Sequence, residues 1–103
     1  MAALIALSPD VDWETSGGLF DWTLEFLIGR LTDRAAADRL QEIVDNNLGS
    51  LWLSEFPLAT QQEIVSFLRT DLIPTAVREL PDSDRSDEAL DQLRELVELT
   101  YQS

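Results

Sequence analysis

The segment LFDWTLEFLIGRL, at residues 19–31, combines strong apolar character with helical periodicity. Eight of its thirteen residues are large and apolar, and at 100° per residue they form two stripes on a helix. Only Asp21, Glu25 and Gly29 share a polar edge. A helix that is apolar around most of its circumference has to be covered on more than one side. The sequence therefore predicts a central helix at 19–31, with the other elements packed around it.

Four further helices are predicted from apolar periodicity and from residues that start or end helices. We expect them at about 34–47, 61–70, 72–80 and 87–101. Thr32 or Asp33 can cap the first of these, because a side-chain oxygen there accepts from free amides of the first helical turn. Thr60 and Glu63 have the spacing of a capping box, which predicts the start of the next helix.

Pro74 would interrupt a continuous helix at 61–80, because proline has no backbone N–H to donate. If Asp71 caps a new helix, Pro74 falls in its first turn, where that donor would have no partner. We therefore expect a kinked pair of helices in this region. Ser86 is the expected cap of the last helix.

Two short apolar segments leave the fold class open at one point. Residues 3–7 and 51–53 are too short for periodicity to distinguish a strand from a helical turn. Our first expectation is an all-α fold, a single helical domain over residues 1–103, with about five short helices in an orthogonal bundle around 19–31. The alternative is a mostly helical fold in which 3–7 and 51–53 pair as a small two-stranded element.

Acidic residues dominate the charge of the chain. Twenty acids face seven bases, all of them arginine, and the net charge is −13. A field of this sign repels nucleic acid and anionic lipid, and it attracts basic surfaces. Two explanations stay open: a partner with a basic face, or an acidic, lysine-poor proteome in which the charge serves solubility.

Signatures of catalysis and of metal binding are weak. Neither histidine nor cysteine occurs, so the commonest general base, the commonest metal ligand and a reactive thiol are missing. Two acidic runs, at 10–21 and 82–88, approach the spacing of a calcium loop, but neither has the glycine that its sharp turn requires. We therefore expect no catalytic site, no cofactor and no metal site.

Charged and aromatic residues mark two candidate surfaces for a partner. On the last helix, i,i+3 and i,i+4 spacing gathers acids into one stripe, and each like-charge pair costs roughly 0.2–0.5 kcal/mol. The stripe comprises Glu88, Asp91, Glu95 and Glu98, and the other candidate partner-binding residues are Asp10, Asp12, Trp13, Glu14 and Trp52. Tryptophan is enriched at interface hot spots but also covers the cores of small domains, so both interpretations of these tryptophans stay open.

These observations predict a non-enzymatic binding protein that neutralises or regulates a basic protein, such as a toxin or a nuclease, by occlusion. In type, the chain resembles bacterial immunity proteins of toxin–immunity pairs and nucleic-acid-mimic inhibitors, although no family motif assigns a site residue. The alternative is a structural or oligomeric helical module, which leaves room for a homo-oligomer. We expect no direct nucleic-acid binding and no membrane insertion, and a cytoplasmic location follows from the lack of a basic leader and of an apolar span.

Overall fold

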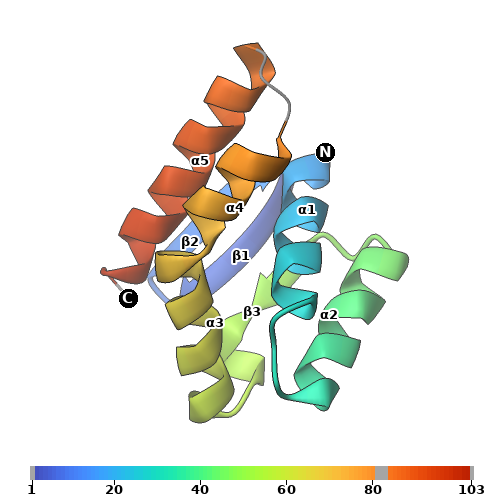
Figure 1. The fold of residues 1–103 in the computed structure, drawn as a ribbon. Coiled ribbons are helices and arrows are strands. Elements are labelled where there is room, and N and C mark those ends of the chain that lie inside the picture. The colour runs from blue at the N-terminus through green and yellow to red at the C-terminus, as the bar shows by residue number, and fades with distance from the viewer. Residues whose placement is uncertain (1, 81–83, 103) are drawn as a thin grey trace.

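Three strands form a mixed sheet in the order β2-β1-β3 in the computed structural model, which describes residues 2–80 and 84–102 (Figure 1). The strands are β1 (Ala2–Ser8), β2 (Val11–Ser16) and β3 (Ser50–Trp52). The first two are antiparallel and are joined by the turn at Pro9 and Asp10. β3 pairs with β1 in parallel, after the chain has crossed back through two helices.

The expectation of an all-α fold is therefore wrong, and the fold is mixed α/β. The alternative contained the pairing between 3–7 and 51–53, which is present, with Ile5 opposite Leu51. It lacked the third strand, Val11–Ser16, whose side chains alternate between buried and exposed. That alternation has the period of a strand with one face on the core, and β1 supplies the partner that keeps it extended.

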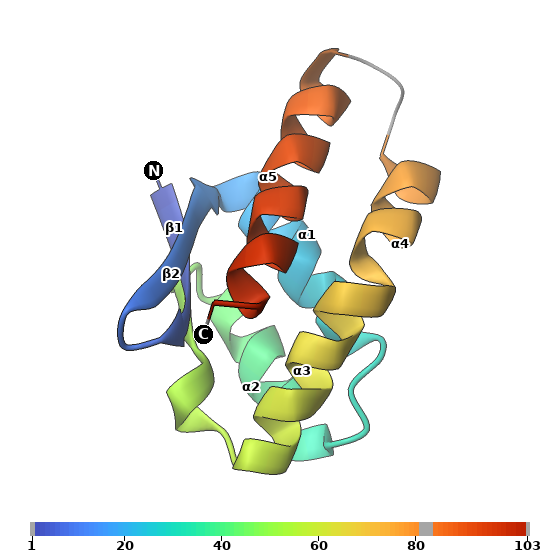
Figure 2. The same ribbon diagram turned by 90° about the vertical axis from the view of Figure 1, so that its left-hand side faces the viewer.

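Five α-helices and one 3₁₀ turn complete the described part of the chain. They are α1 (Gly17–Ile28), α2 (Arg34–Asp45), η1 (Leu53–Glu55), α3 (Leu58–Thr70), α4 (Leu72–Glu79) and α5 (Asp84–Thr100). α3 and α4 are the kinked pair that Pro74 predicts, with the proline in the first turn of α4. The α-helices lie on one side of the sheet and leave its other face uncovered (Figure 2).

α1 supplies the centre of the core. Phe20, Leu24 and Leu27 are at most 1% exposed, and α1 packs against α2, β1 and β2. The helix is thus covered on more than one side, as its apolar circumference predicts. It begins two residues before the expected start, where the Ser16 hydroxyl accepts from the amide of Leu19. Within the described residues, no helix has both the length and the apolar character that crossing a membrane requires.

Of the helix caps expected for α2 and α3, the first is confirmed and the second is wrong. Asp33 is the cap, since its Oδ1 accepts from the amides of Ala35 and Ala36. The expected capping box at Thr60 and Glu63 is wrong, because α3 already begins at Leu58. Both side chains bind the loop before α2 instead. Thr60 donates to Asp33 over 3.1 Å, and Glu63 accepts from the amide and hydroxyl of Thr32 over 2.7 Å each.

Two further capping expectations are also corrected. Asp71 stands at the start of α4 but makes no capping hydrogen bond with its side chain. Its carboxylate lies 3.6 Å from the guanidinium of Arg30, so it joins α4 to the end of α1. Ser86 lies inside α5 rather than before it, because that helix begins at Asp84, and its side chain is outside the described part of the structure.

Candidate protein-binding surface

The uncovered face of the sheet collects three of the predicted partner-binding residues. Directly paired residues of neighbouring strands point to the same face. Asp12 pairs with Ala6, and Ala6 pairs with Trp52, so these three residues form one row across all three strands. A second row consists of Glu14, Leu4 and Ser50. We call these six residues the open sheet face.

The side chains of the first row differ sharply in size and charge. Trp52 is 47% exposed, and Asp12 is exposed at the other end of the row. Ala6 is 5% exposed and contributes only a methyl group between them. Because neighbouring strands lie about 4.8 Å apart, the backbones of Asp12 and Trp52 are separated by about 10 Å. The row therefore presents an indole and a carboxylate with a shorter side chain between them.

Trp13 lies on the opposite face of the sheet from Trp52. It is 1% exposed, and its indole Nε1–H donates to the backbone carbonyl of Gln92 in α5 over 2.9 Å. Thr15, on the same side of β2, donates to the side-chain carbonyl of Gln92. A side chain buried in this way is not available to a partner, so Trp13 is a core residue and is removed from the candidate binding residues.

The predicted acidic stripe lies on a different surface. Glu88, Asp91, Glu95 and Glu98 are all exposed on α5. They lie opposite Leu93 and Leu96, which are fully buried. Because Gln92 binds Trp13 and Thr15 on the inner face of β2, α5 lies on the helix side of the sheet, and the stripe is not part of the open sheet face. The structure thus brings Asp12, Glu14 and Trp52 together but does not add the stripe to them.

The remaining predicted residue, Asp10, lies in the turn between β1 and β2, where it is exposed beside the open sheet face. Ala6 and Leu4 belong to the surface but were not predicted. They could be predicted only from the pairing of β1 with β2, because the register of that pairing decides which face of the sheet each residue occupies.

The open sheet face offers two kinds of contact to a basic side chain. Its carboxylates can accept hydrogen bonds from lysine or arginine, and an exposed indole attracts the same cations through its ring. Among residues 2–80 and 84–102, no group of three or more acids is placed to hold a metal ion. Every buried side-chain nitrogen or oxygen in that part of the chain has a hydrogen-bond partner.

Comparisons of the chain with protein-family models, with curated proteins and with solved structures return no match.

Proposed function

We propose that this protein is a non-enzymatic acidic binding protein that neutralises or regulates a basic protein by covering part of its surface. The observation that carries the proposal is the row of Asp12, Ala6 and Trp52 on a sheet face that no helix of the described residues covers. An aromatic residue left half exposed beside carboxylates combines the two features that interface anchors use, which are apolar area and charge complementarity.

The geometry suggests how a basic side chain would bind. An arginine or lysine laid across this row would place its cation between the indole of Trp52 and the carboxylate of Asp12. Glu14 lies two residues further along the same strand, on the same face, and could accept a second cation. The indole then provides the buried contact, while the carboxylates select for a basic partner.

The acidic stripe of α5 has a different part in this proposal. Its four acids lie on another surface and contribute to a net charge of −13. Exposed charges outside the contact area act mainly on the rate of encounter, because they steer an oppositely charged partner during diffusion. We therefore assign steering to the stripe and contact to the open sheet face.

A retention experiment with matched charge variants tests this division. The protein is immobilised and exposed to an extract of its source cell, and retained proteins are quantified by mass spectrometry. The double variant D12R/E14R should lose the retained basic protein. D91R/E95R should still retain the basic protein once binding has reached equilibrium. Its association should be slower, and the association rate should depend less on salt. The control D38R/E79R changes two exposed acids of α2 and α4 and shifts the net charge equally, to −9.

The outcomes separate this proposal from its alternative. Equal losses in D12R/E14R and in D38R/E79R would show that only net charge matters and would remove the open sheet face as a site. Retention of no basic protein by the unmodified chain would favour a structural or oligomeric module whose acidity serves solubility. In that case the melting temperature should rise steeply up to molar salt, because screening relieves the self-repulsion of the acids.

A further inference from the structure

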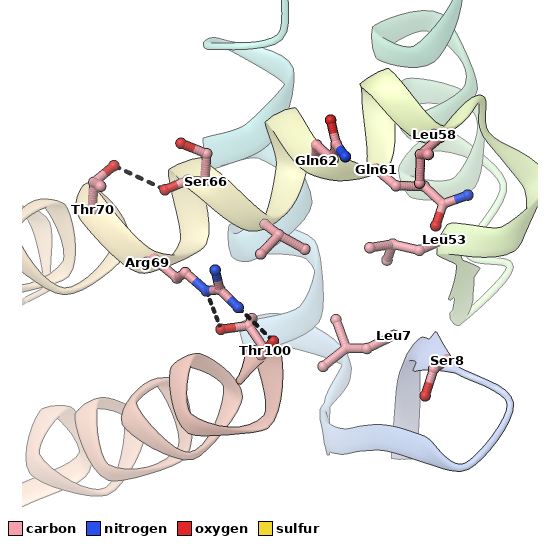
Figure 3. A pocket seen from close by; sticks show the side chains of 11 residues that line it. Leu7, Ser8, Leu53, Leu58, Gln61, Gln62, Ser66, Arg69, Thr70 and Thr100 are labelled. Atoms are coloured by element: carbon pink, nitrogen blue, oxygen red, sulfur yellow. Dashed lines mark hydrogen bonds between the residues drawn. The ribbon is translucent and has the colours of Figure 1, made fainter. Parts of the chain in front are cut away.

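A groove outside the open sheet face combines an apolar end with a polar end. It lies between α3, the end of β1 and the C-terminal end of α5, and its volume is about 490 Å³, within the range of small-molecule sites (Figure 3). Leu7, Leu53 and Leu58 line one end, and Arg69, Ser66 and Thr100 line the other. Leu58 is 68% exposed, so the apolar end has an uncovered hydrophobic wall.

The guanidinium of Arg69 is held in place at the polar end. Its Nε donates to the hydroxyl of Thr100 over 3.0 Å, and its Nη2 donates to the backbone carbonyl of Thr100 over 2.7 Å. The ring of Tyr101 lies against the guanidinium, 4.0 Å from its carbon to the ring centroid. These contacts fix the orientation of the cation before any ligand arrives, which lowers the entropic cost of binding.

One edge of this guanidinium has no partner in the described part of the chain. The bonds to Thr100 use the side edge, formed by Nε and Nη2. The end edge, formed by Nη1 and the second N–H of Nη2, can bind a carboxylate with two parallel hydrogen bonds. In Figure 3 this end edge is directed along the groove toward Leu7 and Leu53.

Arg69 differs from three of the other described arginines in having no acidic partner. Arg30, Arg39 and Arg94 each form an ion pair with an aspartate or a glutamate. Within residues 2–80 and 84–102, Arg69 forms none, and no acid lines the groove. A fixed cation without a counter-ion, in a chain of charge −13, marks this place as complementary to an anion.

We propose that the groove binds an amphipathic monocarboxylate, with its carboxylate on the end edge of Arg69 and its apolar body along Leu7, Leu53 and Leu58. Leu58 and Arg69 are eleven positions apart, which corresponds to about 16 Å along the axis of α3, enough for a medium-length alkyl chain. A single negative charge fits best, because every further charge on the ligand would be repelled by the acidic chain. This site is independent of the open sheet face.

Titration of the isotope-labelled full chain with octanoate, followed by nuclear magnetic resonance, tests the proposal. Amide signals of Leu7, Val65 and Arg69 should shift in a saturable way. The variant R69Q should weaken octanoate binding about tenfold or more, because the charged hydrogen bonds disappear. The matched control R78Q removes an exposed arginine of α4, for which no ion pair is present among the described residues, and should change the affinity less than twofold.

Two further binding measurements test the proposal even if R69Q does not fold. Octylammonium has the same apolar body with the opposite charge and should bind at least tenfold more weakly to the unmodified chain. L58D adds a charge at the exposed apolar end, in the first turn of α3 where an acid suits the helix, and should also weaken octanoate binding. Octylammonium binding as tight as octanoate, unchanged affinity in a folded R69Q, or no saturable shift at the groove amides would each overturn the proposal.

Discussion

Replacing Trp13 with alanine should lower the free energy of unfolding by about 3–5 kcal/mol, the range measured for truncation of large buried aromatic residues. Trp13 is 1% exposed and joins the sheet to α5 through its bond to the carbonyl of Gln92. The substitution removes this apolar area and also removes one hydrogen bond to the partly buried carbonyl of Gln92. Both losses act in the same direction, so the folded state should be strongly destabilised.

Denaturant unfolding followed by circular dichroism measures this effect, and W52A is its matched control. Trp52 lies on the other face of the same sheet and is 47% exposed. Its truncation should therefore cost clearly less than that of Trp13, about 1–2 kcal/mol, because only about half of the indole surface is buried on folding. Equal losses of stability in the two variants would contradict the assignment of one tryptophan to the core and the other to the surface.

Truncation of Trp52 should instead act on binding. If the indole is the anchor of the contact, W52A should speed dissociation of the retained basic protein about thirtyfold or more, corresponding to the ~2 kcal/mol that defines a hot spot. Association should change little, because an uncharged side chain does not steer the encounter. W52A should thus change mainly the dissociation rate, whereas D91R/E95R should change mainly the association rate.

Surface plasmon resonance at two salt concentrations separates the two rates. L48A serves as the control, since Leu48 is another exposed apolar residue, 48% exposed, just before β3. A dissociation rate in W52A no faster than in L48A would show that Trp52 is not the anchor.

The helices could largely be predicted from the sequence because their signals are local. The stripes of 19–31, the aspartate before α2 and the proline between α3 and α4 each act within a few residues of chain. Helix accounts for 66% of the described residues and strand for 16%, so helical periodicity dominates the sequence. This dominance explains why an all-α fold was the first expectation.

The sheet could not be derived in the same way, because its strands depend on distant partners. Residues 50–52 become a strand only by pairing with residues 4–6, more than forty positions earlier. Val11–Ser16 contains only two large apolar residues, and its pairing with β1 decides that they face the core. Strand preference is therefore set by packing context rather than by the segment alone.

The candidate site shows the same limit at the level of single residues. Trp13 and Trp52 were equivalent candidates in the sequence, and a shift of one residue in register would exchange core and surface positions along a strand. The structure removes Trp13 and groups Trp52 with Asp12 through Ala6. The helical period of the acids in α5 predicts that they form one stripe. The sequence near them does not show that this stripe and the open sheet face are different surfaces.

The indole N–H signals of the tryptophans provide the most direct test of the proposed binding surface. The isotope-labelled protein is mixed with the retained basic protein and examined by nuclear magnetic resonance. We expect the Trp52 indole signal and the amide signals of Asp12 and Glu14 to shift or broaden in the complex. The Trp13 indole signal, whose N–H is bonded to Gln92, should stay in place as an internal reference. An unchanged Trp52 signal in a saturated complex would contradict the open sheet face as the binding surface.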